Sequence, residues 1–200
     1  MQRSVAREYI MFLKSNRIHL IRFTERHITP EYVSWLNDSQ VNQYLYTGRI
    51  PISKGQLNDP NDANNIMFAI MTNLHIGDGF TQIQDFVYYI GTCSINSIDY
   101  INRRGEIGYM IGSKKYWRRG IATEVISLIS DYAFNRLNLY KIEASVVDGH
   151  DASIKALEAN KFKEYGIKPE DYFLNGMYLG THKFYKLQNW NYQDDALGEE

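Results

Sequence analysis

Cysteine is nearly absent from this sequence, which holds Cys93 and no other cysteine among its 200 residues. A single thiol excludes an intrachain disulfide and a zinc site made of several thiolates, and it fits a reducing compartment. The five histidines lie far apart, at positions 19, 27, 75, 150 and 182, and form neither an HxH nor an HExxH pattern. We therefore expect no metal site, and we expect Cys93 to be a small buried strand residue.

An excess of charge of either sign is also lacking, since 22 Lys and Arg residues balance 23 Asp and Glu residues and leave a formal net charge of −1. This balance argues against a basic nucleic-acid binder and against a polybasic membrane-surface protein. No apolar run approaches the roughly 20 residues needed to cross a bilayer, and the first residues lack the apolar core of a signal peptide. The sequence therefore predicts a cytoplasmic protein without a nucleic-acid or membrane partner.

What the sequence does have is the composition of a folded domain, with 44% hydrophobic and 22% charged residues. Its length allows one ordinary domain. We expect this domain to span residues 17–190, after an extension or extra helix over 1–16 and before a frayed acidic tail over 191–200. The 16 tyrosines serve either core packing or a pocket, where tyrosine offers an apolar ring and a polar hydroxyl.

Hydrophobic periodicity and turn residues predict the order of the elements. Strands are expected at 17–24, 66–72, 86–95, 106–111 and 141–147, with two more around Asn175-Gly176 within 171–186. Helices are expected at 30–36, 120–138 and 152–160, with a short one that runs to Leu45. Residues 47–64 read as a loop, and Gly77 and Gly79 are assigned to a plain hairpin turn rather than a phosphate loop. This order indicates an α+β domain with a mixed sheet.

The segment from Tyr116 to Thr123 combines a basic turn with the start of a helix. The first N–H groups of a helix have no partner inside it, and the helix dipole adds partial positive charge there. Gly120 lets the backbone approach a ligand closely, and Arg118 and Arg119 add two cations. Because arginine at a helix N-terminus opposes the dipole, this arrangement is unfavourable without an anion. The residues alone therefore predict an anion site suited to a diphosphate.

Three segments, in this order, resemble the GNAT acetyltransferase superfamily. Residues 28–45, with Trp35-Leu36-Asn37-Asp38, resemble its substrate-side helices. Residues 116–124 are similar to its acyl-CoA pyrophosphate loop, although Trp117 stands where the pattern has Gln or Arg. Residues 150–162 are similar to the helix that carries its Asn-x-x-Ser and Gly-Phe motif. The resemblance extends over residues 17–190.

The resemblance implies a mixed, mostly antiparallel sheet, flanked by helices and splayed between its fourth and fifth strands, 106–111 and 141–147. It also implies acetyl-CoA as the cofactor, with the pantetheine arm in the splay and the pyrophosphate on the amides of residues 119–123. The expected cofactor-binding residues are Met110, Ile111, Arg118, Arg119, Gly120, Ile121, Ala122, Thr123, His150 and Ser153.

The activity that the resemblance implies is direct attack of a deprotonated amine on the acetyl thioester, so Cys93 needs no catalytic role. A base must first remove a proton from the amine. We choose Glu106, which strand alternation places on the same face as Met110. The alternative for Glu106 is an exposed carboxylate paired with Arg103 or Arg104.

Two positions depart from the family pattern. His150 replaces an asparagine that contacts the cofactor; a neutral imidazole still donates one hydrogen bond, and turn capping or a role as base are the alternatives. Leu157 replaces the tyrosine that acts as general acid, so the leaving thiolate needs another proton donor. Tyr185 and Tyr178, in the last strands, are candidates by location only. Ser153 is either a cofactor contact or a helix cap.

The resemblance implies that the acceptor is set by segment 37–57 and the last strands. Tyr44, Tyr46 and Arg49 offer two aromatic rings and a cation, which suit a polar acceptor with an anionic group. A small-molecule amine, such as a nucleotide-linked amino sugar, is therefore favoured over a peptide N-terminus, the acceptor of ribosomal-protein acetyltransferases. A non-catalytic acyl-CoA-binding sensor is the alternative from another class. A homodimer is left open.

Overall fold

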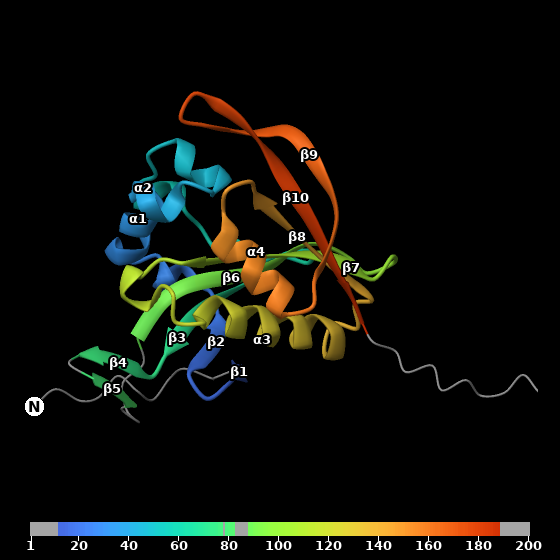
Figure 1. Cartoon of the computed structure of the whole chain (residues 1–200). Coiled ribbons are helices and arrows are strands. Elements are labelled where there is room, and N and C mark those ends of the chain that lie inside the picture. Colours follow the sequence, from blue (N-terminus) through green and yellow to red (C-terminus); the bar gives the residue numbers. More distant parts are fainter. Residues whose placement is uncertain (1–11, 78, 83–87, 189–200) are drawn as a thin grey trace, which may run out of the picture.

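The computed structural model describes residues 12–77, 79–82 and 88–188 (Figure 1). In this part of the chain eight strands form one mixed sheet, and a two-stranded hairpin forms a second. The order across the large sheet is β1 (Leu13–Lys14), β2 (Ile18–Arg22), β3 (Ile66–Thr72), β6 (Tyr88–Asp99), β7 (Arg104–Ile111), β8 (Lys141–Val147), β10 (Met177–Leu187) and β9 (Lys163–Leu174). The expected α+β class is confirmed.

Four α-helices accompany the sheet in the described residues: α1 (Pro30–Asn37), α2 (Ser39–Asn42), α3 (Ile121–Asn135) and α4 (Asp151–Ala159). Short 3₁₀ turns lie at η1 (Glu25–His27), η2 (Tyr46–Arg49), η3 (Lys54–Gln56) and η4 (Lys114–Tyr116). The start of α1 follows the sequence, because the Thr29 hydroxyl accepts the N–H of Tyr32 and Pro30 takes the first helical position.

Both faces of the sheet are covered. One core joins the sheet to α3 and α4 through buried side chains such as Val125 and Leu157. The second core, on the opposite face, joins Tyr32 and Trp35 of α1 to Met110 of β7. Because side chains alternate along a strand, the face that carries Met110 also carries the other even-numbered side chains of β7. We call this face, toward α1 and α2, the α1 face.

The strands β7 and β8 are the one parallel pair in the described sheet, and they pair over only a short length. Their register joins Arg104 to Lys141, Gly105 to Ile142 and Glu106 to Glu143, and pairing ends there. Beyond Glu106 the two strands run apart, which leaves the β8 side of β7 without a strand partner. This geometry confirms the splay expected between 106–111 and 141–147.

Two segments differ from what their local patterns predicted. Residues 1–16 were expected to be an extension or an extra helix, and Leu13 and Lys14 at their end form a strand rather than a helix, because they pair antiparallel with Leu20 and His19 of β2. The strand β9 begins at Lys163, eight residues before the expected start at 171. Its first half was missed because it has little apolar character and is exposed on both faces. The ends at 1–11 and 189–200 lie outside the described residues.

The turn at Gly77 and Gly79 is a hairpin, as expected, since β4 (Leu74–Gly77) pairs antiparallel with β5 (Gly79–Gln82). At the other end of the molecule, Asn175 and Gly176 make the tight turn between β9 and β10, and both have positive φ angles. Pro169 is tolerated in β9 because that strand lies at the sheet edge, where one row of N–H groups needs no partner.

The long β9–β10 hairpin leans over toward α1 and α2 (Figure 1). Tyr172 of β9 is almost fully buried, and its hydroxyl lies 2.9 Å from the Gln43 carbonyl oxygen and 3.1 Å from that of Leu45. Near its base, His182 of β10 lies between two carboxylates, with Nδ1 2.8 Å from Glu164 and Nε2 3.4 Å from Asp148. The hairpin is thus tied to the helical segment on one side and to the sheet on the other.

The His182 contacts predict a pH-dependent contribution to stability. The hydrogen bond to Glu164, and then the bond to Asp148, raise the pKa of His182 above its usual value near 6.5. A histidine whose pKa is higher in the folded state contributes its full stabilisation at pH values below its unfolded-state pKa. This stabilisation is lost as pH rises through the folded-state pKa. We expect His182→Gln to lower Tm by about 2 °C at pH 5.5 and by less at pH 8.5. Equal losses at both pH values in thermal melts would contradict this.

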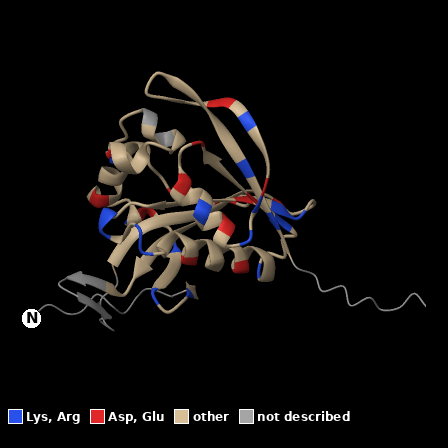
Figure 2. Cartoon of the chain, in the orientation of Figure 1, with Lys and Arg blue, Asp and Glu red and all other residues tan. Residues whose placement is uncertain are grey.

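Charges of both signs are interspersed over the described chain in the view of Figure 2. No helix among the described residues has both the length and the apolar character to cross a membrane. The candidate site therefore rests on the sheet itself, which opens beyond Glu106 and Glu143, where β7 and β8 stop pairing.

Candidate active site

The N-terminus of α3 has the geometry of an anion cradle. Gly120 is the N-cap residue with φ +73°, a left-handed conformation, and Arg118 before it has φ +58°. A Cβ added at Gly120 would meet only the Arg17 guanidinium, at 3.6 Å, so the space over the helix end is open. The N–H groups of Ile121, Ala122 and Thr123 belong to the first turn, where a helix leaves N–H groups without internal partners.

Arg17, which immediately precedes β2, holds this loop in place, a role that the sequence did not indicate. Its Nη1 donates to the Arg119 carbonyl oxygen at 3.0 Å, and its Nη2 lies 2.6 Å from Glu124 Oε2. Glu124 also accepts the Ser15 hydroxyl. Arg17 and Ser15 precede α3 by more than 100 residues, so no local pattern marked them.

The two arginines of the loop differ in what they do. Arg119 turns back, and its Nε donates to the Lys115 carbonyl oxygen at 2.9 Å. Arg118 is exposed at the loop. Arg119 therefore helps to fix the turn, while Arg118 is exposed beside it, and the role of both arginines as cations for an anion stays a prediction.

The open edge of β7 carries the backbone of Met110 and Ile111, beyond the point where β8 parts from it. The indole Nε1 of Trp117 donates to the Ile111 carbonyl oxygen at 2.6 Å. Through this bond Trp117, the residue that departs from the family pattern, joins the loop to the end of the strand. One lone pair of the Ile111 carbonyl is thereby already used.

The turn after β8 is covered by Tyr44 from the segment that follows α2. The Tyr44 ring stacks on His150 with centroids 4.4 Å apart and planes 14° apart, and its hydroxyl lies 3.2 Å from the Gly149 carbonyl oxygen. Burial lowers the pKa of His150, which favours the neutral imidazole. His150 precedes α4 but its side chain makes no cap hydrogen bond, so turn capping is excluded.

Ser153 lies in the first turn of α4, inside the helix, so of its two alternatives the helix cap is wrong. Its hydroxyl is 2.7 Å from the hydroxyl of Tyr109, which comes from the opposite strand β7. The bond therefore links the two sides of the splay on the α3–α4 face. Leu157 of the same helix is buried in the core and offers no proton donor.

Glu106 lies where β7 and β8 part, on the α1 face. Ser145 of β8 donates its hydroxyl to Glu106 Oε1 at 2.6 Å, and Lys183 Nζ lies 2.8 Å from the same hydroxyl. Arg104, the alternative partner, instead lies against Asp99, with Nε 3.5 Å from Oδ2. The sequence does not predict a role for Ser145 or Lys183, because an isolated polar residue in a predicted strand forms no recognisable motif.

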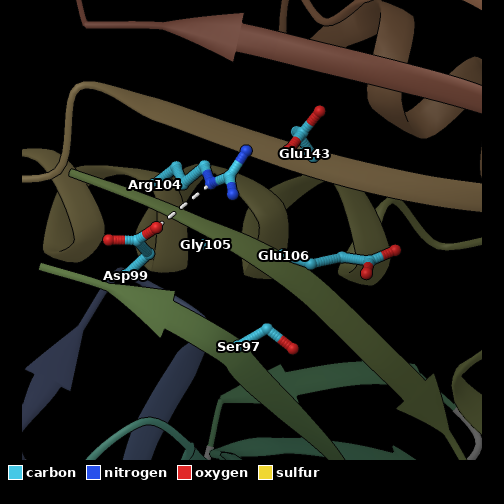
Figure 3. A pocket seen from close by; sticks show the side chains of 6 residues that line it. All are labelled: Ser97, Asp99, Arg104, Gly105, Glu106 and Glu143. Carbon is cyan, nitrogen blue, oxygen red and sulfur yellow. Dashed lines mark ion pairs between the residues drawn. The ribbon is translucent and has the colours of Figure 1, made fainter. Parts of the chain in front are cut away.

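A cavity of about 310 Å³ opens beside Glu106. It is lined by Ser97, Asp99, Arg104, Gly105, Glu106 and Glu143. In Figure 3 the side chains of Asp99 and Arg104 approach each other, while those of Glu106 and Glu143 extend from adjacent strands. Three carboxylates against one guanidinium give this cavity a negative charge.

The two tyrosines considered as general acid lie in very different places. Tyr185 is the register partner of Glu143, which is the register partner of Glu106, so it lies two strands from Glu106, roughly 10 Å away. Tyr178 is exposed near the hairpin tip and packs on Phe173. It is seven residues from Tyr185 along β10, roughly 20 Å. A role as general acid stays a prediction for both tyrosines.

Of the three residues expected at the acceptor, the side chains of Tyr44 and Tyr46 are described, and they make different contacts. Tyr44 lies on His150, as described above, whereas the Tyr46 hydroxyl contacts Asp171 Oδ2 at 3.2 Å and its ring packs on Tyr172. The side chain of Arg49 lies outside the described part of the structure. Tyr44 thus contacts a predicted cofactor residue, His150.

Cys93 is 1% exposed in the middle of β6. Burial raises the pKa of its thiol, which disfavours the reactive thiolate. This confirms the expected small buried strand residue, packed in the core beneath α3 and α4.

A sequence model of the acetyltransferase (GNAT) domain matches residues 17–163. The uncharacterized N-acetyltransferase p20 of Bacillus licheniformis is 37% identical over 99 residues, 50% of this chain and 55% of that protein. Spermidine N(1)-acetyltransferase of Vibrio cholerae is 32% identical over 100 residues, 50% of this chain and 57% of that protein. The chain thus spans about half the length of the curated relatives it matches.

The fold has solved counterparts. The crystal structure of spermidine N-acetyltransferase from Vibrio cholerae, in complex with CoA and spermine, superposes with a TM-score of 0.70. It shares 23% identity, and the match covers 87% of this chain and 97% of that one. At this identity the likeness concerns the fold: the mixed sheet with its splay and its flanking helices.

Proposed function

The chain belongs to the GNAT acetyltransferase family, and on that premise we propose that it transfers an acetyl group from acetyl-CoA to a primary amine of a small molecule. The observation that carries this proposal is the placement of Glu106. Its carboxylate lies where β7 and β8 part and beside an open cavity, with an anion cradle at the far end of the same strand. The strand β7 would thus connect the proposed cofactor site to the proposed base.

The residues around the splay fit acetyl-CoA. The amides of residues 119–123, with Arg118 beside them, would hold the pyrophosphate, since the space over Gly120 is open. The backbone of Met110 and Ile111 would pair with the pantetheine arm along the open edge of β7. His150 and Ser153 border the other side of the splay. When bound, acetyl-CoA supplies the acetyl group as an activated thioester.

Glu106 is the carboxylate best suited to take the proton from the amine. Its neighbour Glu143 already accepts two hydrogen bonds on Oε1, from Lys141 Nζ and from the Tyr165 hydroxyl, each at 3.1 Å. Donors bound to a carboxylate stabilise its charged form and weaken it as a base. Glu106 accepts one hydrogen bond, from Ser145, on Oε1, and a general base must lie within hydrogen-bond reach of the proton it removes.

The charge of the cavity bears on the acceptor. Asp99, Glu106 and Glu143 outnumber Arg104 among its lining residues, so an acceptor arriving as an ammonium ion is attracted, whereas phosphates close to the amine are repelled. We therefore favour a small cationic amine over a nucleotide-linked amino sugar. The relatives named for spermidine acetylation agree with this choice.

The test is acetyl-CoA turnover with a panel of acceptors, read as release of free thiol and as acetylated product by mass spectrometry. The panel holds spermidine, a simple diamine, glucosamine, a nucleotide-linked amino sugar and a peptide with a free N-terminus. We expect turnover with the amines that lack an anionic group. Turnover with the peptide alone would move the acceptor to protein N-termini, and CoA binding without thiol release from any acceptor would make the chain a binding module.

A further inference from the structure

A chain of three polar side chains runs across the α1 face from three different strands. Lys183 of β10, Ser145 of β8 and Glu106 of β7 are joined by contacts of 2.8 Å and 2.6 Å. Lysine ammonium groups only donate, so Lys183 occupies a lone pair of the Ser145 oxygen. The single hydrogen of the Ser145 hydroxyl is then directed to Glu106 Oε1. The direction of both hydrogen bonds is therefore fixed: Lys183 donates to Ser145, and Ser145 donates to Glu106.

These three hydrogen-bonded side chains lie at the point where the sheet opens. Pairing of β7 with β8 ends at Glu106 and Glu143, and Ser145 lies two residues further along β8 on the same face. The bond from Ser145 to Glu106 thus spans the gap at the point where the strands begin to part. Ser145 and Lys183 are themselves register partners in the antiparallel β8–β10 pair, which holds both at one height in the sheet.

Other charges surround Glu106, and none of those with a described contact is directed to it. Arg104 lies against Asp99, and Lys141 donates to Glu143, which is also bonded by Tyr165. Lys183 is the cation that reaches Glu106, through the Ser145 hydroxyl. A bridging hydroxyl fixes which oxygen of the carboxylate is occupied.

We propose that Ser145 and Lys183 are positioning residues for Glu106, an inference that rests on the base role proposed for Glu106 above. Ser145 occupies Oε1 and so presents Oε2 to the amine. Lys183 orients the Ser145 hydroxyl by occupying a lone pair of its oxygen. Neither residue touches the reacting atoms, and both act through Glu106.

The experiment is a double-mutant cycle read as kcat and KM. Lys183→Met and Ser145→Ala are each expected to lower kcat about tenfold and leave the KM for acetyl-CoA unchanged. Lys183→Arg and Ser145→Thr retain the donors and restore the rate. Lys163→Met, which removes an exposed lysine of β9, leaves kcat unchanged.

Combined with Glu106→Gln, Lys183→Met is expected to add no further loss, because its effect passes through that carboxylate. Additive losses, or a kcat that Lys183→Met leaves unchanged, would overturn the inference. Weak effects of Glu106→Gln itself would instead remove the base role.

Discussion

Replacing Gly120 with glutamate weakens CoA binding at least about 100-fold, or about 2.8 kcal/mol, while the domain stays folded. The substitution places a carboxylate over the α3 N-terminus, where the pyrophosphate is expected, and two like charges repel there. The backbone adds to the effect, because φ is +73° at Gly120 and a residue with a side chain is strained there. Glutamate near a helix N-terminus favours the helix itself, so the fold is retained.

Calorimetric titration of CoA measures the loss, and circular dichroism checks the fold. The matched control is Gly176→Glu, since Gly176 also has a positive φ, +84°, but lies in the β9–β10 turn with nothing within 4 Å of an added Cβ. Its CoA affinity should equal that of the wild type. Equal affinities for Gly120→Glu and the control would remove the loop from the cofactor site.

Replacing Glu106 with glutamine lowers kcat by about 100-fold to 10,000-fold, the usual contribution of a general base. The amide is close in shape to the carboxylate, and its oxygen still accepts the Ser145 hydroxyl, so the strand geometry and the KM for acetyl-CoA should not change. The loss is one of proton transfer, because an amide does not accept a proton near neutral pH.

Steady-state kinetics with the best acceptor from the panel measure this effect. Glu143→Gln is the comparison, since Glu143 is the register partner of Glu106 and lines the same cavity, but is held by Lys141 and Tyr165. It should lose far less of kcat. A larger loss for Glu143→Gln than for Glu106→Gln would transfer the base role to the neighbouring strand.

Local sequence patterns were enough for the parts of the fold that depend on local interactions. The α1 start follows from Thr29 and Pro30, and the hairpin at Asn175-Gly176 follows from its turn residues. The start of α3 after Gly120 follows in the same way. Each signal lies within a few residues of the structure it specifies.

The same patterns failed where partners distant in sequence decide the structure. Leu13 and Lys14 have the spacing of a helix but pair with β2, and the polar first half of β9 is a strand because β10 lies beside it. Edge strands exposed on both faces lack the apolar alternation by which strands are recognised. Pairing thus overrode local preference at both edges of the sheet.

The sequence by itself determined the family, the turn at Gly120 that begins α3, and Glu106 as a carboxylate on the face shared with Met110. These depend on motifs and on alternation along a single strand. Only the tertiary structure decided what contacts these residues: Arg17 at the loop, Tyr44 on His150, and the Lys183–Ser145 pair at Glu106. The physical reason is distance along the chain, because the contacts around these sites join residues 38 to 109 positions apart in sequence, which meet only when the sheet assembles.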